Sequence, residues 1–258
     1  MPPESTVAPV QSFARGLTVI TSFDADHREM TLSEIATRTG LARATVRRFL
    51  HTLVDLGYVA SDGRTFVLTP RVLELGFSYL SGLSLPEVAQ PLLEALSRDV
   101  GESSSASVLD GDDIVYVVRV PTRRIMSVGI SIGTRFPAHA TSMGRVLLAG
   151  LTDEELDERL GRLRPTAFTP KTLTSPALVR DAVLLARRQG WALVDGELEA
   201  GLRSIAAPVR ARDGRVLAAV NVSTSTSTSL ETMRERILPA LLEVATTLSD
   251  STKRGPGA

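Results

Sequence analysis

Residues 31–56 read TLSEIATRTGLARATVRRFLHTLVDL, and this stretch predicts two helices joined by a tight turn. Thr31 followed three residues later by Glu34 is the pattern of a capping box, which starts a helix. Gly40 ends that helix, because glycine takes the left-handed conformation without strain. The second helix carries an apolar face at helical spacing, made of Val46, Phe49, Leu50, Leu53 and Leu56. Ala36, Gly40 and Val46 have the spacing of a DNA-binding helix-turn-helix.

The segments on either side predict a winged helix-turn-helix. Residues 11–23 indicate a first helix whose inner face carries Phe13, Leu17, Ile20 and Phe23, and residues 24–29 indicate a solvated loop. After the second helix of the motif, two short apolar runs at 58–60 and 65–68 flank an Asp-Gly pair, which is a strong β-hairpin signal. We therefore assign residues 11–69 to one winged helix-turn-helix domain.

Positive charge gathers on this motif, although the whole chain has 29 basic and 29 acidic residues and is neutral. No acidic residue occurs between Ile35 and Val54. The first residues of such a helix meet base edges in the major groove, and an arginine at a wing tip is favoured in the minor groove. A helix that merely exposes charge is the alternative, but the turn, the wing and the missing acids together favour DNA binding. The predicted DNA-binding residues are Arg38, Arg43, Ala44, Thr45, Arg47, Arg48, His51 and Arg64.

The remaining chain predicts a linker and a second domain. Residues 70–83 indicate a linker helix with Pro70 in its first turn. Residues 84–251 mix amphipathic helices with strands at 103–109, 114–120, 125–132, 191–197, 204–211 and 215–222. Strands joined by hairpin turns, with helices packed on them, indicate an α+β fold with an antiparallel sheet, typical of a small-molecule-sensing domain of the GAF or PAS type. Residues 1–10 and 252–258 are predicted to be disordered.

Several function classes lack support. His139 lies near Ser142, but no GxSxG elbow surrounds them, and no Gly-rich phosphate loop precedes a helix. With three histidines and no cysteine, a metal site or a cofactor is not expected. No apolar run approaches the length of a membrane helix, and the N-terminus lacks a signal-peptide core. We therefore expect a cytoplasmic protein that is not an enzyme and that associates with the nucleoid through DNA.

Long ordered blocks of the chain resemble the IclR family of transcriptional regulators. They include SFARGLTVI at 12–20, the helix-turn-helix stretch, PAHATSMGRVLLAGL at 137–151 and DGELEAGLRSIAAPVRARDGRVLAAVNVS at 195–223. The block from 123 to 151 is similar to the Pca/Pob/Cat-type subgroup, which controls breakdown of protocatechuate, 4-hydroxybenzoate or catechol through the β-ketoadipate pathway. His139 stands where that subgroup more often has tyrosine.

The resemblance implies an effector pocket in the second domain. Carried over by position, its lining is Ile125, Ser142, Met143, Asp195, Leu202, Ser204, Asn221 and Ser223. Ser142 opens a helix whose backbone N–H groups suit an anion, and alternation on a strand places Asn221 and Ser223 on one face. We add Arg123, Arg124 and Arg135 as candidates for pairing with a carboxylate; a solvated loop is the alternative for all three.

The expected partners are an operator in double-stranded DNA, an aromatic or dicarboxylic acid effector and a second or further copies of the chain, as a homodimer or homotetramer. The resemblance also allows contact with RNA polymerase. Two alternatives stay open. The chain could be a metabolic protein that binds small molecules and uses its helix-turn-helix for protein contacts, or its effector could be a smaller acid of the glyoxylate or pyruvate type.

Overall fold

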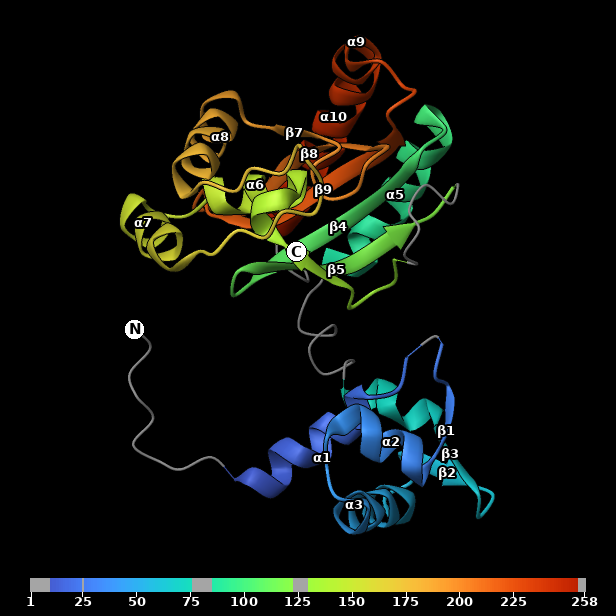
Figure 1. The fold of residues 1–258 in the computed structure, drawn as a ribbon. Coiled ribbons are helices and arrows are strands. Elements are labelled where there is room, and N and C mark those ends of the chain that lie inside the picture. The colour runs from blue at the N-terminus through green and yellow to red at the C-terminus, as the bar shows by residue number, and fades with distance from the viewer. Residues whose placement is uncertain (1–9, 25, 76–84, 123–129, 255–258) are drawn as a thin grey trace. The chain divides into compact units, whose positions relative to one another are not determined.

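The computed structural model describes residues 10–24, 26–75, 85–122 and 130–254. The chain separates into two compact units, Met1–Gly82 and Leu83–Ala258, and each is described by itself (Figure 1). No helix within the described ranges is long and apolar enough to cross a membrane.

The first unit contains the predicted helix-turn-helix. Its elements are α1 (Gln11–Thr21), β1 (Glu29–Thr31), α2 (Leu32–Thr39), α3 (Arg43–Asp55), β2 (Val59–Ser61) and β3 (Thr65–Leu68). The capping box forms as predicted: the Thr31 N–H donates to Glu34 Oε2 at 2.7 Å, and the Glu34 N–H donates to Thr31 Oγ1 at 3.4 Å. Gly40 ends α2 at a φ of 66°. Val19, Ile35, Val46 and Leu50 are buried together and form the centre of a small core.

The wing has an additional strand that the sequence did not suggest. Glu29 was predicted in a loop, but it begins β1, which pairs antiparallel with β3 in a sheet of order β1-β3-β2. Met30 pairs with Phe66 and is buried, and this burial explains why so short a segment becomes a strand. The hairpin turn forms as predicted, because Asp62 Oδ1 accepts from the N–H groups of Arg64 and Thr65 at 2.9 and 2.7 Å.

Two predictions for the helical faces are wrong. The side chains of Phe13 and Leu17 were expected to face the core, but Phe13 is 69% exposed and Leu17 43% exposed. Leu56, expected on the apolar face of the second helix, is also exposed, and it follows the end of α3 at Asp55. The first half of α1 extends past the three-helix core, so its apolar side chains line a surface groove instead.

Part of the predicted linker helix 70–83 differs in form. It begins as a 3₁₀ turn, η1 (Pro70–Val72), with Thr69 Oγ1 accepting from the Arg71 N–H, and helical residues follow as far as 75. Residues 76–83 lie outside the described residues, as do residues 1–9 of the predicted disordered N-terminus.

The second unit is built on an antiparallel sheet. Its described strands have the order β6-β5-β4-β9-β8-β7. Their bounds are β4 (Ser103–Asp110), β5 (Asp113–Val120), β6 (Arg135–Pro137), β7 (Ala192–Asp195), β8 (Leu202–Arg210) and β9 (Val216–Ser225). The third predicted strand, at 125–132, is misplaced: residues 130–132 are not a strand, 125–129 lie outside the described residues, and β6 pairs with the edge of β5 instead.

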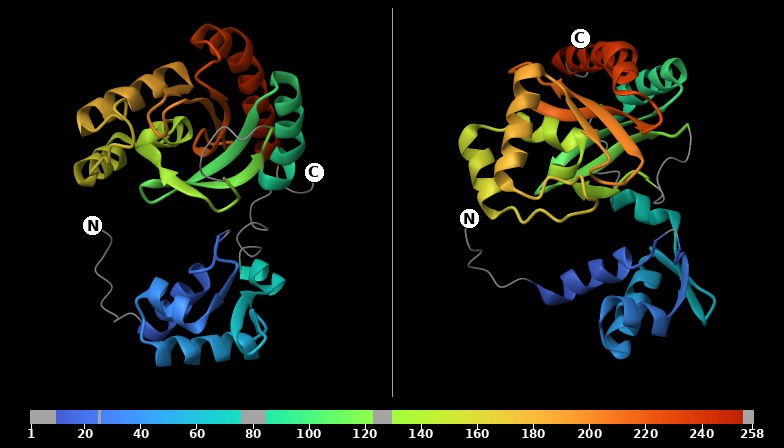
Figure 2. Two further views of the ribbon diagram at one scale, coloured as in Figure 1. Left: turned by 45° about the vertical axis from the view of Figure 1, so that its right-hand side comes forward. Right: turned by 45° about the horizontal axis from the view of Figure 1, so that its top comes forward.

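Helices cover both faces of this sheet (Figures 1 and 2). On one face α5 (Leu85–Val100) and α10 (Leu238–Arg254) pack over the larger core, and α9 (Leu230–Thr232) and a π turn, η3 (Met233–Ile237), lead into α10. On the other face lie η2 (Ala138–Ala140), α6 (Ser142–Ala149), α7 (Asp153–Arg162) and α8 (Pro176–Gln189). The α+β prediction is therefore confirmed.

The predicted disordered tail, 252–258, begins too early. Helix α10 continues to Arg254, and Thr252 Oγ1 donates to the Arg210 carbonyl at 3.0 Å, which anchors this helix end to β8. Residues 255–258 lie outside the described residues.

Candidate functional site

The N-terminal half of α3 presents a basic surface. The predicted DNA-binding residues that α3 exposes are Arg43, Ala44, Arg47, Arg48 and His51. Thr45 is half-buried, and Arg64 is exposed in the β2–β3 turn. Val46, Leu50 and Leu53 face the core on the opposite side of α3. Ala42 precedes the helix without a side-chain cap, as the sequence indicated, so the first N–H groups of α3 have no side-chain acceptor from that residue. This arrangement presents arginines and open N–H groups to an anionic partner such as a phosphate.

Arg38 occupies a different environment from the other predicted DNA-binding residues. Its guanidinium donates to the Ser22 carbonyl at 3.0 Å and to Asp24 Oδ2 at 2.6 Å, and it lies 3.2 Å from His27 Nε2. These contacts tie α2 to the segment after α1. This pairing was not predictable from the sequence, because Asp24 lies in a segment with no periodic pattern.

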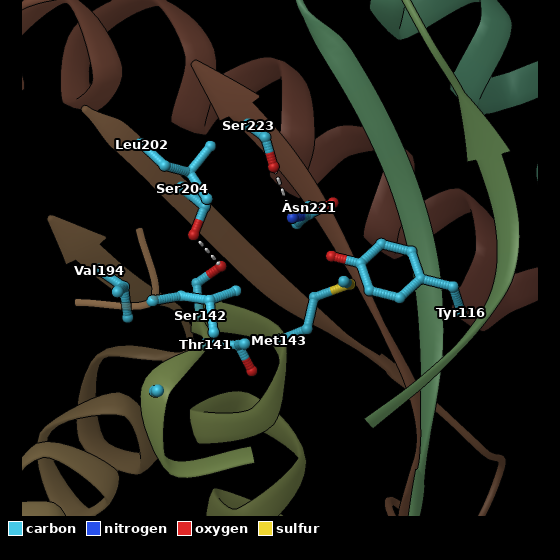
Figure 3. A pocket seen from close by; sticks show the side chains of 11 residues that line it. Tyr116, Thr141, Ser142, Met143, Val194, Leu202, Ser204, Asn221 and Ser223 are labelled. Carbon is cyan, nitrogen blue, oxygen red and sulfur yellow. Dashed lines mark hydrogen bonds between the residues drawn. The ribbon is translucent and has the colours of Figure 1, made fainter. Parts of the chain in front are cut away.

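In the second unit, a partly open cavity lies at the start of α6 (Figure 3). The cavity measures about 20 Å³, which is room for a single water-sized molecule. Its lining residues come from β5, α6 and the turn before it, β7, β8 and β9, and from the loop between β7 and β8: Tyr116, Ala140, Thr141, Ser142, Met143, Val194, Leu198, Leu202, Ser204, Asn221 and Ser223.

Hydrogen bonds hold the polar side chains of this cavity in place. Ser142 Oγ donates to Ser204 Oγ at 2.8 Å, and Asn221 Nδ2 donates to Ser223 Oγ at 3.1 Å (Figure 3). Asn221 Oδ1 is buried without a hydrogen-bond partner. Because an unmade hydrogen bond costs a buried polar atom free energy, this oxygen favours a ligand or water that donates to it.

The turn before α6 explains why these side chains meet. Thr141 caps the helix, since its Oγ1 accepts from the Gly144 N–H at 3.0 Å. Gly144 lies against the backbone of Ala138 in η2, where a Cβ atom would overlap the carbonyl oxygen and Cα of Ala138. The absence of a side chain at Gly144 therefore lets η2 fold back on α6 and brings Ala140 and Thr141 to the cavity.

A buried ion pair also holds α6 in place. Arg145 Nη2 lies 2.5 Å from Glu197 Oε2, and both side chains are nearly inaccessible to solvent. Glu197 also accepts from the Leu173 N–H at 3.3 Å, and its carbonyl accepts from Thr172 Oγ1 at 2.6 Å. Leu198, the next residue, lines the cavity. The pair thus joins α6 to the segment that carries one wall of the cavity.

The structure brings together six of the predicted effector-binding residues around this cavity: Ser142, Met143, Leu202, Ser204, Asn221 and Ser223. Arg135 and Asp195 do not line it. Arg135 pairs with Asp110 at 2.5 Å and Asp113 at 3.2 Å, and Asp195 pairs with Lys171 at 2.9 Å and Arg203 at 2.8 Å. The predicted residues Arg123, Arg124 and Ile125 lie outside the described residues.

Sequence reasoning missed the remaining wall. Tyr116 contributes an aromatic ring whose hydroxyl has its pKa raised by burial to about 12, so the phenol stays protonated near neutral pH. Thr141 and Leu198 lie in connecting segments without a periodic pattern. Arg119, three residues after Tyr116, was not among the predicted residues either. Its Nη1 donates to Ser105 Oγ at 2.9 Å.

These features define a class of protein in which one unit carries a winged helix-turn-helix with a basic recognition surface and the other an α+β domain with a small cavity lined by polar and apolar side chains. The family models agree with this description. One described as the bacterial transcriptional regulator IclR C-terminal domain matches residues 77–250, and the IclR helix-turn-helix domain matches residues 12–63. The chain belongs to the IclR family of transcriptional regulators, and the expectation that it is not an enzyme is confirmed by this membership.

Three relatives illustrate the similarity. The Pca regulon regulatory protein of Pseudomonas putida is 48% identical over 90% of this chain and 80% of its own length. The structure of a transcriptional regulator from Rhodococcus sp. RHA1 is 57% identical, with a TM-score of 0.85 over 95% of this chain and 98% of the other. An IclR homologue from Microbacterium hydrocarbonoxydans, solved in complex with 4-hydroxybenzoate, is 27% identical, with a TM-score of 0.82 over 93% and 98% of the two chains.

Proposed function

We propose that this protein regulates genes for the breakdown of aromatic acids, binding an operator through α3 and the wing and an organic acid in the cavity at the start of α6. The observation that carries the proposal is the cavity itself. Serine hydroxyls, an asparagine amide and the N-terminus of α6 surround a space bounded by Met143, Leu198 and Leu202. A mixed polar and apolar lining suits a small ring that carries polar substituents.

The relatives point to the chemical class of the ligand. The Pseudomonas putida relative is named for the Pca regulon, and the Microbacterium homologue holds 4-hydroxybenzoate. Calorimetric titration of the full chain with protocatechuate, 4-hydroxybenzoate, β-ketoadipate and cis,cis-muconate tests this assignment, with glyoxylate and pyruvate as the alternative class. Binding only to glyoxylate or pyruvate would contradict the aromatic assignment and leave the family membership intact.

DNA binding through α3 is tested by substitution. Arg43→Ala and Arg47→Ala are each expected to weaken operator binding by about tenfold or more, because arginine contacts to bases or phosphates contribute roughly 1–3 kcal/mol. Arg162→Ala, an exposed arginine on α7, is the matched control and should leave affinity unchanged. Unaltered affinity in both test variants would show that α3 does not enter the major groove.

Salt dependence separates a regulator from a protein that uses its helix-turn-helix for protein contacts. Neutralised phosphates release counterions, so the logarithm of operator affinity should fall steeply and linearly with the logarithm of salt concentration. A gel-shift titration with the DNA upstream of the gene measures this slope. No retardation at low salt would favour the protein-contact alternative.

We also propose that the chain binds DNA as a dimer. Two copies of a winged helix-turn-helix recognise two half-sites on one duplex, and the two-fold symmetry of the protein then matches the operator. For an effector to change operator binding, it must bind two arrangements of the dimer with different affinity.

A further inference from the structure

A β-bulge in the sheet of the second unit brings an arginine onto the face that forms the cavity. The register between β4 and β5 shifts between Ala106 and Ser107, so that Ser107 pairs with Tyr116 but Ser105 pairs with Arg119. Residues directly opposite each other on paired strands point to the same face. Tyr116 and Arg119 therefore share a face although they are three residues apart, a spacing that regular alternation would place on opposite faces.

This face is the one that carries the cavity. Ser107 Oγ donates to Met143 Sδ at 3.2 Å, and Tyr116 and Met143 both line the cavity (Figure 3). On the other side of β4, Ser105 pairs with Asn221 of β9, which also lines it. One row of side chains across β5, β4 and β9 therefore consists of Arg119, Ser105 and Asn221. The Arg119 guanidinium donates to Ser105 Oγ, the middle member of this row.

Arg119 differs from the other arginines of this region in its partners. Arg135, Arg145 and Arg203 each pair with a carboxylate at 2.5–2.8 Å. No carboxylate among the described residues lies within ion-pairing distance of Arg119, and its Nε is buried without an acceptor. Burial lowers the pKa of Arg119, because desolvation disfavours its charge. A partly buried guanidinium with an open donor favours an anion beside it.

We propose that Arg119 binds the carboxylate of the acid effector, on the sheet face that carries the cavity and next to the lining residue Asn221, whose β4 partner Ser105 accepts from Arg119. Arg119 itself does not line the cavity in this structure, so its guanidinium turns towards the ligand when the acid binds. This assignment rests on the proposed function and names the group that selects an acid. Arg119 takes the place of Arg135 as the proposed partner of the carboxylate, because the Arg135 guanidinium is already paired with Asp110 and Asp113.

The experiment compares each acid with its uncharged counterpart. The full chain is titrated calorimetrically with protocatechuate and 4-hydroxybenzoate and with the primary carboxamide of each. The same titrations are repeated for Arg119→Gln and Arg119→Lys. Arg135→Gln is the matched control, because it removes an arginine of the neighbouring strand β6 whose guanidinium is already paired with Asp110 and Asp113. Thermal unfolding of each variant checks that the second unit is folded.

We expect the wild-type protein to prefer each acid over its amide by at least tenfold. Arg119→Gln should bind the acids about 10- to 100-fold more weakly, since a hydrogen bond to a charged group contributes roughly 1.5–3 kcal/mol and 1.4 kcal/mol is tenfold. Its affinity for the amides should change little. Arg119→Lys should recover part of the loss, and Arg135→Gln should bind like the wild type.

The outcomes separate this assignment from the function on which it rests. If the wild type binds neither acid, the aromatic-acid function fails and the role of Arg119 fails with it. If the wild type binds an acid but Arg119→Gln binds it equally well, only the role of Arg119 is overturned. If Arg119→Gln does not fold, the wild-type comparison decides, because equal affinity for acid and amide would also overturn the assignment.

Discussion

Gly144 is a single residue on which the shape of the cavity at the start of α6 depends. A methyl group there would overlap the backbone of Ala138, and backbone cannot move aside as a flexible side chain can. We expect Gly144→Ala to destabilise the second unit by about 1–3 kcal/mol, as overpacking does, and to weaken effector binding by displacing Thr141. Urea unfolding followed by the fluorescence of Trp191, the only tryptophan, measures the stability of this unit.

The control for this substitution is Gly161→Ala. Gly161 lies in α7, and a Cβ atom there would meet nothing within 4 Å. Alanine should stabilise the helix by up to about 1 kcal/mol, because glycine is the poorer helix former. If both variants lose stability equally, the close approach of η2 to α6 is not the cause.

His139 predicts a pH dependence of stability. It is buried in η2 with Nε2 lacking a partner, and burial lowers its pKa despite a hydrogen bond with the Thr166 backbone. Arg145, Glu197 and Asp113 are the charged groups that act on it. The unfolded chain takes up the proton near pH 6.5, before the folded chain does, so the free energy of unfolding should fall as the pH drops from about 7 towards 5.

The substitution His139→Gln isolates this contribution. It should flatten the dependence of the free energy of unfolding on pH in that window. His51→Gln, which changes an exposed histidine on α3, should leave the slope as it is. A slope that persists in His139→Gln would assign the effect to another group.

At this scale the sequence predicted those cavity-lining residues that follow simple alternation. Asn221 and Ser223 sit two apart on one strand, and cross-strand pairing adds Ser204 opposite Ser223. Arg119 was not predictable, because a bulge has no composition signal and reverses the face of every later residue on β5. The ion pairs of Arg135 with Asp110 and Asp113 were not predictable, because the proximity of these residues depends on the position of β6.

At the scale of elements, the buried ion pair between α6 and the β7–β8 connection gives the next prediction. Glu197→Ala should destabilise the second unit by about 3–5 kcal/mol, because it leaves the Arg145 charge buried and unpaired. Replacing both residues by apolar ones, Arg145→Met with Glu197→Leu, should cost less than Glu197→Ala alone. Urea unfolding of Arg145→Met, Glu197→Leu and the double variant completes the cycle.

An exposed pair provides the comparison. Arg162 and Glu158 lie 3.2 Å apart on the surface of α7, and breaking such a pair should cost only about 0.3–0.5 kcal/mol. Equal costs for the two pairs would mean that Arg145 keeps its solvation when Glu197 is removed.

The helix-turn-helix was predictable as a set of elements because its signals are local. The capping box of α2, the glycine at its end and the Asp-Gly turn are each contained within a few residues. Strand β1 was not, since its three residues become a strand only when Met30 pairs with Phe66, far along the chain. The exposed face of α1 was missed for a related reason: an apolar stripe shows that a helix has a partner but does not show whether that partner belongs to the same chain.

For the whole molecule, the exposed apolar face of α1 leads to a prediction about the oligomeric state. The first unit has an apolar groove of about 430 Å³, whose lining includes Phe13, Leu17, Phe49, Leu56 and Leu75. An exposed apolar groove of this kind suits a second copy of the chain, as the proposed dimer requires. We expect Phe13→Ser to halve the molar mass measured by light scattering at micromolar concentration while changing monomer stability by less than about 0.5 kcal/mol.

Leu178→Ser, on α8 of the second unit, is the matched control, because Leu178 is also exposed, at 52%. It should leave the molar mass unchanged. An unchanged mass for Phe13→Ser would place the contact between copies on another surface.

The small volume of the effector cavity bears on how such a regulator sets its sensitivity. Ligand pockets usually measure a few hundred cubic ångströms, against about 20 Å³ here, so the aromatic acid that we propose as the ligand would fit only after the walls move apart. The measured affinity is then the intrinsic affinity multiplied by the fraction of molecules in the wider form. Substitutions that never touch the ligand, in η2 or beside the Arg145–Glu197 pair, should therefore shift the inducer concentration at which genes respond. Two regulators with identical contact residues can therefore respond at very different effector concentrations. In a biosensor built from this chain, this response concentration is best adjusted by substitutions at residues that support the cavity without lining it.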